Sequence, residues 1–139
     1  MTLTKEKFRE AVFQALFSME LASSDESELA KTLSKELQIS RKNSFEAIAK
    51  ATEIFAVKHK LDEKIDQLST DWPSERLQSI ERTVLRLGLF EILYDKSLPP
   101  AIVIAEGIRL VKKFGQHEAI PLINALLDRA FQERTLKDQ

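Results

Sequence analysis

The residue types that most often act in catalysis or hold metal ions are rare in this chain. It has no cysteine and two histidines, His59 and His117, which lie far apart in the sequence. The missing cysteines exclude disulfides, thiolate nucleophiles, iron–sulfur clusters and cysteine-ligated zinc. Neither histidine belongs to a His-Glu-x-x-His pattern, so we expect both to contact backbone or solvent at helix ends rather than a metal.

The acidic residues form no recognisable site. Asp62, Glu63 and Asp66 are close in sequence, but a calcium loop needs more oxygen ligands and a glycine turn. No phosphate-binding glycine loop, nucleophile elbow or nucleotide-binding fingerprint is present. We therefore predict that the protein is not an enzyme and has no metal site and no cofactor, which leaves a binding function.

Basic residues are the remaining candidates for a binding site. Those that are grouped lie at Lys5, Lys7 and Arg9, at Arg82 and Arg86, and at Lys112 and Lys113. The formal net charge is −1, which excludes a strongly basic nucleic-acid binder but not a local basic patch. On position alone most of these cations solvate a helix face, and Lys112 and Lys113 also complement a helix C-terminus.

The elements that must position these residues are predicted to be helices. The chain has 139 residues, the size of one domain, and its three glycines and four prolines leave few tight turns. Apolar residues recur at helical spacing over residues 8–19, 29–37, 45–56, 61–68, 80–94, 104–111 and 120–130. The predicted fold class is all-α, a single compact domain of six to seven helices.

Three residues on the apolar helices are predicted to have structural roles. Gly88 is expected to permit close helix packing, because glycine costs about 1 kcal/mol against alanine inside a helix. Arg86 is predicted to be a buried or half-buried hydrogen-bond anchor. Asn124 is expected to bond internally to the backbone, because a buried amide without partners costs about 1–3 kcal/mol.

No part of the sequence is predicted to enter a membrane or a secretion pathway. Residues Met1–Glu10 are charged and lack the apolar core of a signal peptide. No run of about 18 apolar residues is present. We expect a soluble cytoplasmic protein.

Four short segments form a recognisable pattern in this order: Arg9-Glu10-Ala11-Val12 near the start, Val84-Leu85-Arg86, Lys112-Lys113-Phe114-Gly115 and Ile123-Asn124-Ala125-Leu126-Leu127-Asp128. Together they resemble the NusB family of transcription antitermination factors. The resemblance spans essentially the whole chain, although residues 23–71 carry little of it. It implies one domain over residues 1–139, built from two packed helical subdomains of about residues 4–68 and 74–134.

The resemblance also implies partners. It predicts binding of single-stranded boxA-type RNA together with the ribosomal protein NusE. The complex would join antitermination assemblies on RNA polymerase during ribosomal RNA synthesis, in the bacterial cytoplasm.

Residue roles follow from the resemblance where positions match. The expected RNA-binding residues are Lys5, Lys7, Arg9, Phe17, Gln116 and Glu118. Glu75 and Glu81 match the face that meets NusE. Phe17 could equally be a core residue, and either glutamate could instead favour the positive end of its own helix.

The chain departs from the family pattern at two places that matter for RNA. Glu6 and Glu10 dilute the basic segment at the start. In Ala119-Ile120-Pro121-Leu122 the chain lacks a basic or aromatic stretch, and Leu122 replaces an aromatic that could stack on a base. Because such stacking is worth roughly 1–3 kcal/mol per base, weaker RNA affinity than in a typical member is predicted.

Two alternatives keep the helical fold. NusB-like domains also occur fused to ribosomal RNA cytosine methyltransferases, but this chain has no room for a methyltransferase domain and no catalytic cysteine. The other alternative is a helical homodimeric scaffold, in which Phe8, Phe13 and Phe17 spread around the first helix and leave part of it for a second copy.

Overall fold

The computed structural model describes residues 3–22, 25–69 and 76–137. Throughout these ranges the regular structure is helical, as the sequence predicts. The elements in chain order are α1 (Lys5–Leu21), α2 (Glu26–Leu37), α3 (Arg41–Ala56), α4 (Lys58–Leu68), α5 (Ser79–Leu93), α6 (Pro100–Phe114), the short 3-10 helix η2 (His117–Ala119) and α7 (Ile120–Lys137). In the described ranges, no helix is long and apolar enough to span a membrane.

Packing divides the chain into two compact units, residues 1–57 and 58–139. The sequence prediction placed residues 58–68 in the N-terminal half. In the structure these residues form α4, which belongs to the second unit because it packs on α5 and α7.

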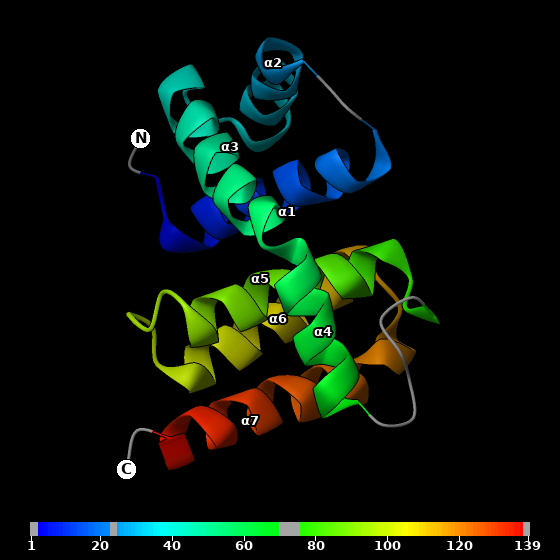
Figure 1. Ribbon diagram of the computed structural model, residues 1–139. Coiled ribbons are helices and arrows are strands. Elements are labelled where there is room, and N and C mark those ends of the chain that lie inside the picture. Colours follow the sequence, from blue (N-terminus) through cyan, green and yellow to red (C-terminus); the bar gives the residue numbers. More distant parts are fainter. Residues whose placement is uncertain (1–2, 23–24, 70–75, 138–139) are drawn as a thin grey trace. The chain divides into compact units, whose positions relative to one another are not determined.

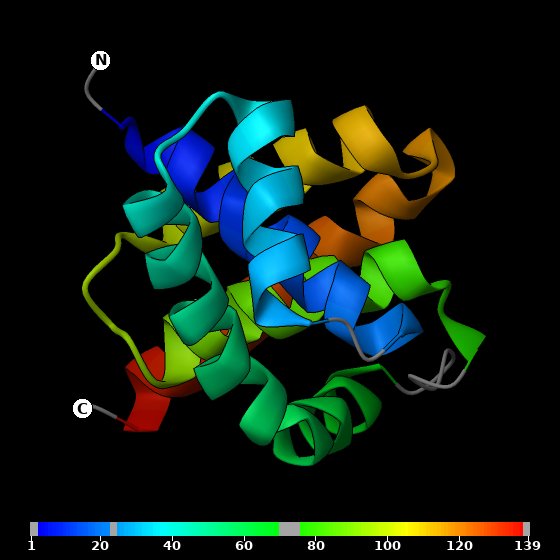
Figure 2. The same cartoon turned by 90° about the horizontal axis from the view of Figure 1, so that it is seen from above.

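The first unit is a three-helix cluster. Helices α2 and α3 lie side by side, and both contact α1 (Figures 1 and 2). Thr4 caps α1 by accepting a hydrogen bond from the Lys7 N–H, and Ser40 caps α3 in the same way through the Asn43 N–H. The fully buried side chains at its centre include Phe13, Leu33, Ile48 and Ile54.

The second unit is built around α5. This helix contacts α4, α6 and α7, so it is buried around most of its circumference, as its apolar sequence predicts. Gly88 allows close packing of α7, because a Cβ atom at this position would lie 2.8 Å from Leu127 Cδ2. Leu127 is itself fully buried, so it has little freedom to move aside.

An ion pair joins α4 to α5 inside this unit. The Arg86 guanidinium donates from Nε to Asp62 Oδ1 at 2.9 Å and from Nη2 to Asp62 Oδ2 at 2.7 Å. Arg86 is 5% exposed, so the prediction of a buried hydrogen-bond anchor is confirmed. The two parallel hydrogen bonds fix the orientation of the two groups, in addition to the attraction between their opposite charges.

The prediction for Asn124 was wrong. Its side chain is exposed, although Ile123, Leu126 and Leu127 around it are buried. The three buried residues form the inward stripe of α7, and the helical repeat turns Asn124 away from that stripe. An exposed amide is solvated by water and needs no partner in the protein.

Candidate nucleic-acid and partner interface

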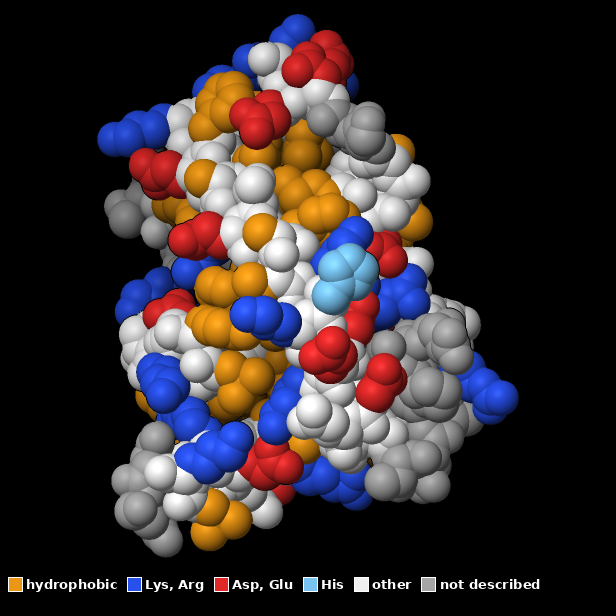
Figure 3. Space-filling view, viewed as in Figure 1, with side chains coloured by type: hydrophobic (Ala, Val, Ile, Leu, Met, Phe, Trp, Pro, Cys, Tyr) orange, Lys and Arg blue, Asp and Glu red, His pale blue; other side chains and the backbone are white. Residues whose placement is uncertain are grey.

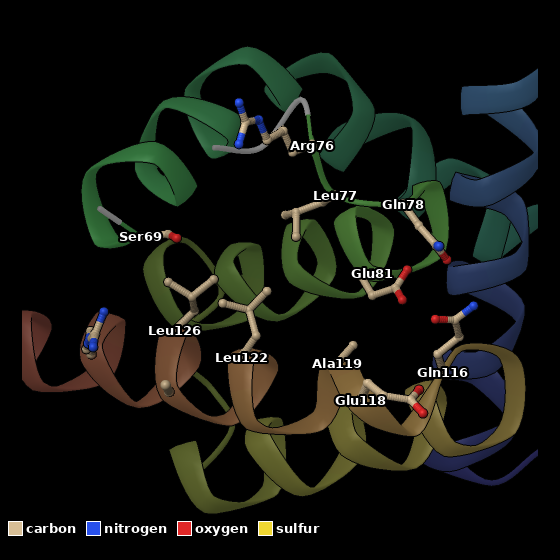
Figure 4. Close-up of a pocket in the computed structure, with 12 residues that line it drawn as sticks. Ser69, Arg76, Leu77, Gln78, Glu81, Gln116, Glu118, Ala119, Leu122 and Leu126 are labelled. Atoms are coloured by element: carbon tan, nitrogen blue, oxygen red, sulfur yellow. The ribbon is translucent and has the colours of Figure 1, made fainter. Parts of the chain in front are cut away.

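The second unit contains an open pocket of about 540 Å³ between the start of α5 and the start of α7. Figure 4 shows its lining. The apolar part is formed by leucine and alanine side chains: Leu77, Ala119, Leu122, Ala125 and Leu126. The polar part is formed by Ser69, Arg76, Gln78, Glu81, Gln116, Glu118 and Arg129.

Glu81 is the most unusual residue in this pocket. It lies in the first turn of α5 and is 5% exposed. Its Oε2 atom is buried and has no hydrogen-bond partner within the described part of the chain. Leaving a buried acceptor unsatisfied costs about 1–3 kcal/mol, and more for a charged group. Such a group suits a site where a partner supplies the missing donor.

Gln116 and Glu118 lie in the same pocket. Gln116 precedes η2, Glu118 lies within it, and both side chains are exposed. The resemblance assigns these two residues to RNA and Glu81 to NusE. The structure brings all three into one pocket, which their separation in sequence does not reveal (Figure 4).

The pocket combines three kinds of recognition chemistry. Leu122 and Leu126 offer an apolar surface to a ring or an aliphatic stem. Glu81 and Gln116 offer acceptors to N–H donors. The guanidinium groups of Arg76 and Arg129 suit a carboxylate or a phosphate. Arg129 is held in place, because its Nη1 donates to the backbone oxygen of Leu68 at 2.8 Å.

Sequence reasoning missed both arginines of this pocket. Arg76 stands just before α5 and Arg129 lies in the middle of α7, so neither belongs to a group of basic residues. Only the packing of α7 against α5 brings them to one pocket. No signal in the sequence could have found this pair.

The first unit holds the predicted basic segment in the first turns of α1. Lys5 is exposed and Lys7 is half-buried, whereas Arg9 is 8% exposed. Lys5 and Lys7 are therefore better placed than Arg9 to reach a phosphate in solution. Arg9 already has an interaction within the protein.

Phe17 lies on α1 and is half-buried. It stacks on Phe13, with ring centroids 6.3 Å apart and ring planes 13° apart. This packing supports the core alternative for Phe17, and the exposed part of the ring leaves the binding alternative open. Glu75, the second residue predicted to meet NusE, lies outside the described residues.

The structure shows no candidate metal centre in its described ranges, where no three histidine or acidic side chains form a group that could hold an ion.

Comparison with known proteins decides the family. The family model described as the NusB family matches residues 6–132. The chain belongs to the NusB family. Its relatives are named transcription antitermination proteins, so this is a family of transcription factors and not of enzymes. One such NusB, from Dehalococcoides mccartyi, is 39% identical over 129 residues, which covers 91% of this chain and 89% of the relative.

Solved NusB structures share the fold. The structure of T. maritima NusB superposes with a TM-score of 0.78 at 29% identity, and covers 96% of this chain and 94% of that one. A chain in the crystal structure of antitermination factors NusB and NusE in complex with dsRNA superposes with a TM-score of 0.77 at 26% identity. That match covers 93% of this chain and 96% of the other.

Proposed function

We propose that this NusB-family chain binds single-stranded boxA-type RNA together with the ribosomal protein NusE. The complex would join antitermination assemblies on RNA polymerase during ribosomal RNA transcription, in the bacterial cytoplasm. A related chain forms part of a complex of NusB, NusE and double-stranded RNA, which supports RNA and NusE as the two partner classes.

One observation on this chain carries the proposal. Gln116 and Glu118 line the same pocket as Glu81, whose buried Oε2 atom has no hydrogen-bond partner among the described residues. A site with an unfilled acceptor, an apolar surface and two arginines is equipped for a ligand that brings donors, apolar area and negative charge. RNA and a protein partner together bring all three.

We assign the roles as follows. Lys5 and Lys7 contact backbone phosphates, which contribute affinity without sequence information. Glu118 accepts hydrogen bonds from base amino groups, because an ionised carboxylate cannot donate and would repel a phosphate. Glu81 accepts a hydrogen bond from a donor side chain of NusE.

The test of RNA binding is a titration at several salt concentrations. A boxA-type single strand and a strand of the same composition in scrambled order are compared, with a duplex as a third ligand. Neutralising phosphates of a single strand gives a slope of log affinity on log salt near −0.7 per phosphate. The proposal predicts a negative slope and a preference for the boxA-type strand. Equal binding of both single strands would contradict the boxA assignment, and no binding at any salt would contradict RNA binding.

The homodimer remains a separate prediction. Phe13 is 1% exposed and packs inside the first unit, so of the three phenylalanines only Phe8 and Phe17 retain exposed surface for a second copy. Light scattering over a dilution series decides the question, because a strict monomer at high concentration removes the homodimer.

A further inference from the structure

A second, smaller pocket lies at the C-terminal end of α7. It has a volume of about 110 Å³ and is lined by Lys64, Leu93, Lys96, Glu133, Arg134 and Lys137. We call it the α7 basic pocket. Its residues come from α4, α5, the loop after α5, and α7, so only the fold brings them together. Figure 3 shows the Lys and Arg side chains that gather at the lower left of the view, over this end of α7.

Two of its four cations already have partners. Lys64 Nζ lies 2.5 Å from Glu133 Oε2. Arg134 donates from Nη1 to the backbone oxygen of Ile92 at 3.0 Å, and its guanidinium lies 5.3 Å from the centre of the Phe131 ring. These contacts hold Lys64 and Arg134 in position on the pocket wall.

The other two cations, Lys96 and Lys137, are exposed. Among the described residues, neither ammonium group has a hydrogen bond or an ion pair. Lys96 also has a positive backbone φ of 40°, a conformation that residues other than glycine, asparagine and aspartate seldom adopt. A lysine therefore stands where glycine would be the conformationally easier residue.

Helix ends explain part of this charge. The pocket adjoins the C-termini of α5 and α7, and each attracts cations with a partial charge of about −0.5. Glu133 is the one carboxylate in the pocket lining. When Glu133 and the two half-charges of the helix ends are subtracted from the four cations, about two positive charges remain, on a chain whose formal net charge is −1. Helix capping alone does not account for the excess.

The size of the pocket limits what it can hold. Pockets for small organic molecules measure roughly 300–1,000 Å³, several times the volume found here. A tetrahedral anion fits better, with Lys96 and Lys137 free to move onto its oxygens and Arg134 fixed beside them. The apolar Leu93 adds no acceptor that would oppose an anion.

We infer that the α7 basic pocket binds a backbone phosphate group of RNA, as a contact separate from the pocket that contains Glu81. This inference rests on the proposed function, because RNA is the source of phosphate that the proposed function supplies. Free inorganic phosphate shares the same chemistry, and the experiment separates the two sources.

The experiment compares the full chain with the double variant Lys96→Ala/Lys137→Ala. RNA affinity is measured over a range of salt concentrations with the boxA-type strand. Loss of the one phosphate contact should make the salt slope less negative by about 0.7, the value for one phosphate of a single strand, and lower the affinity several-fold at low salt. Both lysines are exposed and have no partner among the described residues, so the urea midpoint should fall only slightly, through the loss of two cations near helix C-termini.

The matched control is Lys35→Ala/Lys42→Ala, which removes two exposed lysines from α2 and α3. It loses the same net charge but leaves the α7 basic pocket intact. Equal effects of both double variants would assign the change to general charge loss and overturn the inference. Wild-type affinity and slope in Lys96→Ala/Lys137→Ala would overturn it directly.

A second arm titrates inorganic phosphate at constant ionic strength and follows the amide NMR signals of residues 96 and 134. Two results together would assign the pocket to free phosphate and not to RNA. The amide signals would shift with phosphate, and the double variant would leave the salt slope of RNA affinity unchanged. A wild-type chain that binds no RNA at all would instead contradict the proposed function, and the inference would be rejected with it.

Discussion

Glu81 shows how one residue can report on a binding site. Its carboxylate lies in the first turn of α5, where the positive helix end favours a negative charge. That favourable position compensates for part of the cost of burial, yet Oε2 still has no donor in the described protein. Glu81 can therefore stabilise the start of α5 and also accept a hydrogen bond from a partner, and a substitution can separate these two roles.

We predict that Glu81→Gln weakens NusE binding and leaves the fold intact. Glutamine keeps the shape but removes the charge, and a hydrogen bond to a charged group is worth about 1.5–3 kcal/mol, or at least tenfold in affinity. The free energy of unfolding should stay equal or rise, because an unpaired buried charge is removed. Calorimetric titration with NusE and urea unfolding measure the two quantities.

The exposed Glu118 supplies the control, as Glu118→Gln changes charge in the same pocket without relieving burial. Lower stability of Glu81→Gln with unchanged NusE affinity would make Glu81 a structural residue.

Leu122 offers a test in which a substitution should strengthen binding instead of weakening it. It lines the pocket that contains Glu81, and it is the position at which the resemblance implies an aromatic residue in other members. We predict that Leu122→Tyr increases affinity for the single strand by at least about fivefold, because base stacking is worth roughly 1–3 kcal/mol. Fluorescence anisotropy with labelled RNA measures the gain. Leu122→Met, which adds no ring, should leave affinity unchanged, and an equal effect of both substitutions would exclude stacking at this position.

At the scale of elements, α5 organises the second unit through one ion pair and one glycine. Arg86 and Asp62 lock α4 to α5, and Gly88 lets α7 approach. Neither contact involves a residue that lines the pocket that contains Glu81.

We predict that Asp62→Ala lowers the free energy of unfolding by about 3 kcal/mol. The substitution removes two hydrogen bonds and the ion pair from the buried Arg86 guanidinium. Breaking a buried pair from one side typically costs 3–5 kcal/mol, and the lower end applies here because the Asp62 side chain is 23% exposed. Urea unfolding measures the change. Glu63→Ala, an exposed neighbour on the same helix, should change stability by less than about 0.5 kcal/mol. Equal effects of the two substitutions would show that the ion pair does not stabilise α4.

The sequence predicts these elements better than it predicts the sites. Helical spacing of apolar residues finds each of the seven α-helices in the described ranges, although not the short 3-10 helix η2. Asn124 was assigned wrongly because its sequence neighbours are buried while the helix turns its own side chain outward. Local spacing reports which face of a helix is apolar, but it does not report which helix covers that face.

Both pockets depend on contacts between segments that are distant in sequence. Glu81 and Gln116 line one pocket because α5 packs against α7, and Lys64 and Lys137 line another because α4 packs against α7. A charge pattern along the chain cannot predict such convergence. The resemblance supplied Gln116, Glu118 and Glu81 as separate contacts, and the fold shows that they share one pocket.

At the scale of the whole molecule, the near-zero net charge has a consequence for affinity. A formal charge of −1 gives no general attraction to RNA, so binding must depend on local groups such as Lys5, Lys7 and the α7 basic pocket. Few phosphate contacts mean modest affinity for RNA alone. A protein partner that adds contacts to the same RNA would then raise the overall affinity.

The most direct test is RNA titration of the full chain with and without saturating NusE at physiological salt. We predict measurable but weak binding of the boxA-type strand alone and tighter binding with NusE. By linkage, NusE should bind more tightly by the same factor when RNA is present. No binding of RNA in either condition, together with no complex between this chain and NusE, would contradict the account.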